Sequence, residues 1–153
     1  MPRIDRRAIA AAWILALFAA GPAEACTISV TSVAFGSYDT ISPANDDATG
    51  TLTAACHPSV QSPVVTIAAG SSGAILARAM VNGATTLNYN LYTDIGHTTI
   101  WGDGTTGASV TLTGGTVVAG QRIFNRTIYG RIPALQPVGA GLYTDTMVVT
   151  LTF

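Results

Sequence analysis

The chain of 153 residues contains no lysine, only two cysteines and only two histidines, and its net charge is −1. Charged residues make up only 10% of it, so no surface is basic enough to bind nucleic acid or anionic lipid through its charge. A run of about 18 uninterrupted apolar residues, which a membrane-spanning helix needs, is also missing. These absences exclude a nucleic-acid-binding protein and one that is stably inserted in a membrane.

Residues 1–25 have the three zones of a secretory signal peptide. Three arginines precede an apolar run over residues 8–20, and a small-x-small motif ends the segment. A lipidated Cys26 is an alternative, but Ala23 stands where the leucine of a lipidation motif is expected. We therefore predict that this segment is removed during export and that residues 26–153 form a single domain.

The two cysteines, Cys26 and Cys56, both lie in the predicted exported domain. Two cysteines in an exported chain favour a disulfide. It would close a loop of about 30 residues and stabilise the fold by roughly 3 to 4 kcal/mol. The alternative is a metal site, but a structural zinc needs four ligands and only His57 and His97 could complete the set. We predict the disulfide, with no metal and no cofactor.

The apolar residues of the domain recur with period two, and threonine, valine and glycine replace the residues typical of helical proteins. The clearest strand covers residues 144–153, where alternate side chains form one apolar face: Met147, Val149, Leu151 and Phe153. Six more strands are predicted between turn-rich segments, at residues 27–35, 50–56, 64–69, 86–93, 109–113 and 122–132. About seven antiparallel strands predict an all-β, immunoglobulin-like sandwich.

Three patterns suggest other functions, each weakly. Residues 102–107 have the spacing of a dinucleotide-binding loop, but residues 109–113 after them have a strand pattern where that motif needs a helix. His57 and His97 are candidates for a catalytic base or for metal ligands, yet no nucleophile motif accompanies them. Trp101 and several tyrosines could stack on a sugar, although aromatic residues in strands more often belong to the core. We predict that the protein is not an enzyme.

Several segments carry a resemblance to a known family. They are residues 26–39 (CTISVTSVAFGSYD), 87–94 (LNYNLYTD), 99–104 (TIWGDG), 129–133 (YGRIP) and 141–153 (GLYTDTMVVTLTF). In this order, and with both cysteines, they make the predicted domain resemble the spore coat protein U family, which includes subunits of archaic chaperone-usher pili of Gram-negative bacteria. The resemblance implies an immunoglobulin-like fold that lacks its last strand. A periplasmic chaperone supplies that strand first, and a neighbouring pilus subunit replaces it at the usher.

The residues support part of this implication independently. Because residues 144–153 have an apolar face and no later strand to cover them, their free backbone edge must be paired by another chain or remain exposed. By resemblance, the chaperone would add its strand here and hold the carboxylate of Phe153. We predict that the groove for this strand is lined by Met147, Val149, Leu151 and Phe153, with Val30 and Phe35 from the first strand. The alternative is that residues 144–153 are an interior strand of a complete sandwich.

The resemblance also predicts a position in the pilus. Shaft subunits of this kind carry an alternating extension before the first cysteine, which they donate to the next subunit. Residues 21–25 have no such alternation, and Pro22 lacks the N–H that a strand ladder needs. We therefore expect a terminal subunit at the cell surface, at the tip or in an accessory position, with a structural or adhesive role. The alternative function is a self-contained secreted sandwich that binds carbohydrate or a surface polymer.

Overall fold

The larger of two β-layers is a five-stranded antiparallel sheet. The computed structural model describes residues 25–153, so the predicted signal peptide, apart from Ala25, lies outside the described residues. The strands of this sheet follow the order β1-β2-β9-β6, and β8 pairs with the first residues of β9, 121–123. Their bounds are β1 Cys26–Val30, β2 Asp46–Cys56, β6 Asn90–Tyr92, β8 Thr116–Val118 and β9 Gln121–Ile132.

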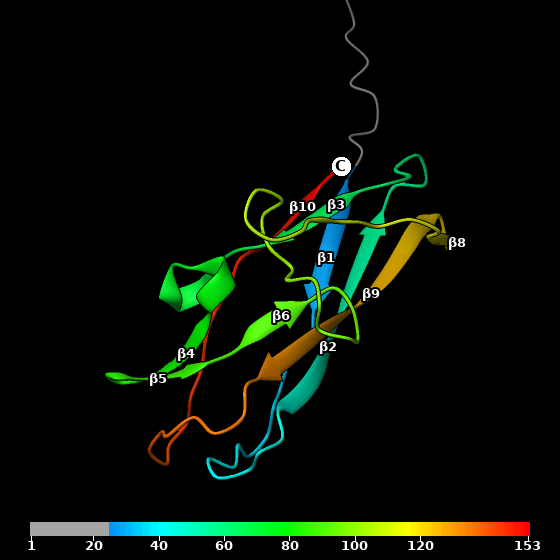
Figure 1. Cartoon of the computed structure of the whole chain (residues 1–153). Coiled ribbons are helices and arrows are strands. Elements are labelled where there is room, and N and C mark those ends of the chain that lie inside the picture. Colours follow the sequence, from blue (N-terminus) through cyan, green and yellow to red (C-terminus); the bar gives the residue numbers. More distant parts are fainter. Residues whose placement is uncertain (1–24) are drawn as a thin grey trace, which may run out of the picture.

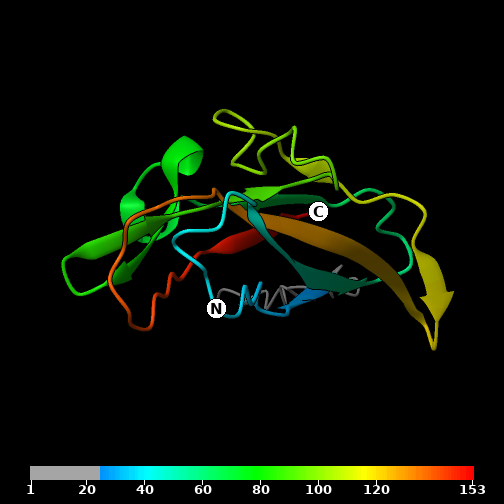
Figure 2. The ribbon, with the colours of Figure 1, turned by 60° about the horizontal axis from the view of Figure 1, so that its bottom comes forward.

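The second layer combines a three-stranded sheet with a hairpin. The sheet has the order β10-β3-β7, with β3 at Val64–Ile67, β7 at Val110–Thr111 and β10 at Val149–Thr152. The hairpin pairs β4 (Ala79–Asn82) with β5 (Thr85–Asn88), and two short 3-10 helices, η1 (Gly70–Ser72) and η2 (Ile75–Ala77), precede it. The hairpins β4–β5 and β8–β9 project from opposite ends of the molecule (Figures 1 and 2).

The predicted all-β sandwich is confirmed, although the described chain has ten strand segments where about seven were predicted. One predicted strand, 86–93, is split into β5 and β6 at Tyr89, and β4 and β8 were not predicted at all. The core lies between the layers, because alternate residues of the long strands face inward. Buried side chains of β2 and β9 pack there against Trp101 and residues of β3, as a single cluster that includes Leu52, Ala54, Phe124, Ile128, Val65 and Ile67.

The predicted disulfide is present. Cys26 and Cys56 are joined across a sequence separation of 30, and they are direct partners in the β1–β2 register. The bond therefore fixes the beginning of β1 to the end of β2.

The first strand is shorter than the predicted span of residues 27–35, because β1 ends at Val30. Beyond it, residues 31–35 lean over the inner face of the large sheet, where glycines leave room. A Cβ atom at Gly130 would lie 2.6 Å from Cγ1 of Val33 and 2.7 Å from Cζ of Phe35, and one at Gly50 would lie 2.9 Å from Cγ2 of Val33. The side chains of Val33 and Phe35 occupy the space that side chains at these glycines would otherwise take.

The last strand also departs from its predicted span, since β10 covers only Val149–Thr152 of residues 144–153. Its neighbour in the sheet is interrupted. Thr144 exchanges backbone hydrogen bonds of 2.8 and 3.1 Å with Val81 of β4, and Val148 accepts one of 2.9 Å from Ala68 just after β3. The helices η1 and η2 lie between these two neighbours in the sequence. The ladder is therefore broken in the middle of the segment.

Candidate functional site

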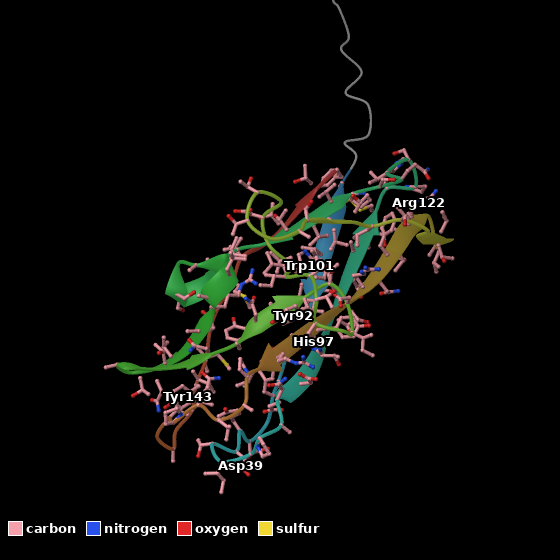
Figure 3. All side chains as sticks on the ribbon, in the orientation of Figure 1. Asp39, Tyr92, His97, Trp101, Arg122 and Tyr143 are labelled. Carbon is pink, nitrogen blue, oxygen red and sulfur yellow. A yellow bond between two sulfur atoms is a disulfide. The ribbon has the colours of Figure 1, made fainter. Side chains whose placement is uncertain are left out.

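An apolar groove opens between the first and last strands of the sandwich. It consists of two cavities of about 460 and 670 Å³, which share Val33, Phe35, Met80 and Tyr143 as lining residues and therefore adjoin. We call them together the edge groove. The larger cavity lies between residues 33–40 and 138–143. The loops that line the larger cavity lie at the bottom of Figure 1, and Figure 3 places Asp39 and Tyr143 there.

The smaller cavity reaches two strands with unpaired outer edges, at Val30 of β1 and at Val149 of β10. β1 forms the edge of the large sheet, where it pairs only with β2, and β10 forms the edge of the small sheet, where it pairs only with β3. Among the described residues no ladder joins β1 to β10. Free N–H and C=O groups along an edge can pair with an extended chain from outside.

Four of the six predicted groove residues come together in the smaller cavity. Val30 and Phe35 line it from the first strand region, and Met147 and Val149 line it from the last. Val30 and Phe35 would lie on opposite faces of a regular strand, because their numbers differ by five. The end of β1 at Val30 is what allows both to reach the groove.

The other two predicted residues do not line either cavity. Leu151 is half-buried and packs against the core cluster, whereas Phe153 follows the end of β10 and is 56% exposed. Sequence reasoning also missed lining residues from the middle of the chain, which only the folded topology brings to the groove: Ile67, Met80, Tyr89, Leu91 and Ile128.

A hydrogen-bonded polar group, formed by Tyr89 and Asp145, is part of the lining of the smaller cavity. The hydroxyl of Tyr89 donates a hydrogen bond of 2.7 Å to Oδ2 of Asp145, and Oδ1 of Asp145 accepts hydrogen bonds of 2.8 Å from the N–H groups of Ser71 and Thr146. The Tyr89 hydroxyl is also 3.3 Å from the sulfur of Met147, and its ring contacts Phe35 edge-on at a centroid distance of 6.0 Å. This group therefore joins the two walls of the groove.

The protonation states of this pair follow from its surroundings. Burial acts to raise the pKa of Asp145, but the hydrogen bonds from Ser71, Tyr89 and Thr146 outweigh it and hold that pKa below its usual value. Burial, and after it the hydrogen bond to Asp145, raises the pKa of Tyr89 well above its usual value. Asp145 is therefore the ionised acceptor and Tyr89 the neutral donor.

Behind the groove, Arg78 is completely buried without an ion pair among the described residues. Its guanidinium donates to the carbonyl oxygens of Ile67, Ala68 and Trp101 at 2.8 to 3.1 Å, and to Oδ1 of Asn90 at 2.7 Å. Burial lowers the pKa of Arg78. These acceptors replace the water that the guanidinium loses, and they join the break after β3 to the core.

The two candidate histidines each have local partners in the structure. Nδ1 of His57 contacts the hydroxyl of Ser59 at 2.7 Å, whereas His97 packs edge-on against Tyr92 at 5.1 Å and lies 3.8 Å from Asp47 (Figure 3). Within residues 25–153 no group of three or more metal-ligating side chains occurs.

In the same part of the chain, no helix is long and apolar enough to cross a membrane. Residues 102–107 form a loop that leads into β7 and not into a helix.

The fold and the edge groove define the class of the protein as an all-β sandwich with an apolar groove between two unpaired edges. The family model of the Spore Coat Protein U domain matches residues 14–150, and this chain belongs to that family. One relative is Protein U of Myxococcus xanthus, which is 36% identical over 133 residues, with 78% of this chain and 70% of Protein U covered. The predicted family membership is confirmed.

A solved structure shares the fold. It is the CsuC-CsuE chaperone-tip adhesion subunit pre-assembly complex from the archaic chaperone-usher Csu pili of Acinetobacter baumannii. The matched chain gives a TM-score of 0.59 at 21% identity, over 85% of this chain. This chain spans 40% of the length of that chain. At this identity the similarity establishes a common fold.

Proposed function

We propose that this chain is a subunit of a chaperone-usher pilus and that it receives an extended strand in the edge groove. A periplasmic chaperone supplies the strand first, and a neighbouring subunit replaces it at the usher. The observation that carries the proposal is the groove between residues 30–35 and 143–149, which reaches the unpaired edge strands β1 and β10 at Val30 and Val149. Family membership and the fold shared with a chain of a chaperone–subunit complex support it.

An extended strand fits this groove better than a compact ligand does. Its backbone can hydrogen-bond to a free strand edge, while alternate side chains fill apolar pockets along the groove. The same strand would cover side chains that are exposed on the groove wall, such as Val30, which is 42% exposed. Left uncovered, an apolar groove beside free edges favours aggregation, which gives a reason for a chaperone.

The proposal extends to export and position. Residues 1–25 serve as the signal peptide, and the single domain of residues 26–153 passes through the periplasm to the cell surface. The domain acts as a terminal subunit, at the tip or in an accessory position. This position is supported by the sequence of residues 21–25, where Pro22 and the lack of alternation are unsuited to a donated strand.

The test is expression of the full chain in a Gram-negative periplasm, with and without the archaic chaperone encoded in the same genome, followed by size-exclusion chromatography. We expect the soluble protein to be recovered as a one-to-one complex. The variant V30D should prevent the complex, because it places a charge on the groove wall. The matched control S29D changes the neighbouring exposed residue, which points to the other side of β1, and should leave the complex intact.

A stable, cooperatively melting monomer without the chaperone would overturn the proposal. So would a complex that V30D and S29D affect equally, because the groove would then not be the binding surface. The first outcome would leave the self-contained sandwich that binds carbohydrate or a surface polymer as the function to test, with a glycan-binding screen.

A further inference from the structure

The pattern of the last segment leaves its register undecided. Tyr143, Asp145, Met147, Val149 and Leu151 are half-buried, and the residues between them are exposed. A slip by one residue would turn every side chain to the wrong face, but a slip by two would keep each face as it is. Such a slip would also place Thr146 where Thr144 now pairs with Val81, so the bridge to β4 would keep the same residue type.

The backbone ladder does not remove this ambiguity at its centre. Residues 145–147 lie between the bridge at Thr144 and the bond at Val148, beside the break that η1 makes between β3 and β4. In this break the side chain of Asp145 makes hydrogen bonds where backbone ladder bonds are missing. It accepts the N–H of Ser71, the N–H of Thr146 and the hydroxyl of Tyr89.

The seat of Asp145 is shaped for one side chain. A Cβ atom on Gly70 would lie 2.3 Å from Oδ2 of Asp145, so the carboxylate fits only because residue 70 is a glycine. Asp145 is the only charged residue in the segment 143–152. Moved by two residues, it would lose these donors while its charge stayed half-buried, which is unfavourable.

We propose that Asp145 is a positioning residue that sets the register of residues 143–152 and thereby places Met147 and Val149 on the wall of the edge groove. Its role in strand uptake rests on the proposed function, whereas its role in the register does not. The sulfur of Met147 is 3.3 Å from the Tyr89 hydroxyl that Asp145 holds, so the register and the lining of the groove are set at the same point.

The register can be measured by NMR on the full chain, purified with the chaperone as above. Ala68 and Val148 form a hydrogen-bonded pair, so Ile67 and Val149 are the adjacent non-hydrogen-bonded pair, whose Hα atoms lie close enough for a strong NOE. In the wild type we expect the NOE between Ile67 and Val149. In D145V the segment keeps its alternation of buried and exposed residues but loses the carboxylate that sets the register. A second NOE from Ile67, to Met147 or to Leu151, should therefore appear.

Moving the carboxylate along the segment should shift the register by the same number of residues. In D145T/M147D the carboxylate moves by two residues, so the NOE of Ile67 should shift from Val149 to Leu151. D145N keeps the shape of the side chain and one acceptor oxygen, and should retain the native NOE. If Asp145 only stabilised the fold, D145T/M147D would not move the NOE from Val149 to Leu151.

A steric test is independent of the charge. G70A should displace Asp145 and reproduce the second NOE of D145V. The matched control is G73A, because Gly73 has a similar positive φ of 68° against 75° for Gly70, but no atom lies within 4 Å of its Cβ position. Equal spectra for the two variants would count against the seat.

The inference is overturned if D145V keeps the single NOE between Ile67 and Val149, or if D145T/M147D does not shift this NOE to Leu151. If the wild-type chain forms no complex but shows this register dependence as a free protein, the proposed function fails and the register role stands. If the wild type forms the complex and D145V takes up the chaperone with an unchanged register, the register role fails and the proposed function stands.

Discussion

At the scale of single residues, Arg78 is a charged side chain buried in the fold without an ion pair among the described residues. A buried guanidinium loses its hydrogen bonds to water, and here main-chain carbonyls and the side chain of Asn90 accept hydrogen bonds in their place. These acceptors belong to the end of β3, to Trp101 and to the start of β6, which the fold brings together around one side chain. Arg78 thus replaces hydrogen bonds that a continuous strand after β3 would have made.

We expect R78M to lower the free energy of unfolding by about 3 kcal/mol, because it keeps an apolar stem but leaves several buried acceptors without donors. Urea unfolding of the full chain measures this loss. The control is R126M, since the side chain of Arg126 is exposed and makes no hydrogen bond or ion pair within residues 25–153. Its change should stay within about 0.5 kcal/mol. Similar losses for the two variants would show that the carbonyl contacts do not stabilise the fold.

The role of Arg78 had no signal in the sequence. Except for the side chain of Asn90, its acceptors are backbone oxygens, which every residue carries, and they lie up to 23 positions away in the chain. The same holds for Asp145, which stands in an alternating strand pattern without any sign of its partner Ser71, 74 positions away. In contrast, the apolar groove residues Met147 and Val149 could be predicted, because strand alternation alone assigns them to one face.

At the scale of elements, the path of residues 31–35 determines one wall of the groove. The chain leaves the edge of the large sheet after Val30, and Val33 and Phe35 turn over the inner face. Gly130 makes this possible through the absence of a Cβ atom, and its backbone needs no left-handed conformation. Close approach is therefore the reason for a glycine at this point of β9.

G130A should lower the free energy of unfolding by about 1 to 3 kcal/mol, because its Cβ would overlap Val33 and Phe35 in a packed region. Thermal unfolding gives the loss, and uptake of the chaperone should fall with it as the wall moves. G139A is the matched control, because no atom lies within 4 Å of the Cβ position at Gly139 and its φ is not positive. If G130A is as stable as G139A, the wall must be able to move without cost.

The predicted bounds of the strands agree with the structure to different degrees, and β2 begins at Asp46, four residues before its predicted span of 50–56. The predicted strand 122–132 agrees with β9 to within one residue, and these same residues pair with β2 without a break. The predicted strands 27–35 and 144–153 are too long, because their alternation continues where their partners do not. Pattern shows which side chains share a face, but the ends of a strand depend on the neighbour that pairs with it.

At the scale of the whole molecule, the two sheets are held together by their shared core but share no ladder at the groove. A strand inserted between β1 and β10 would therefore convert two exposed edges into interior positions. Edge amides normally exchange fast with solvent, whereas amides of interior strands are protected up to the stability of the whole fold. Hydrogen exchange can thus distinguish insertion in the groove from binding elsewhere.

In the chaperone complex, we expect amides in residues 26–35 and 143–152 to exchange about as slowly as those of β2 and β9. Residues 41–45 and 134–137, which line neither cavity of the edge groove, should exchange fast in the same sample and serve as an internal control. The S29D complex should give the wild-type pattern. Fast exchange along either edge, with slow exchange on the outer face of the large sheet, would mean that the chaperone binds that face and that the edge groove stays empty. Protection of one edge alone would mean that the inserted strand joins one sheet only, since a strand bridging both must protect both.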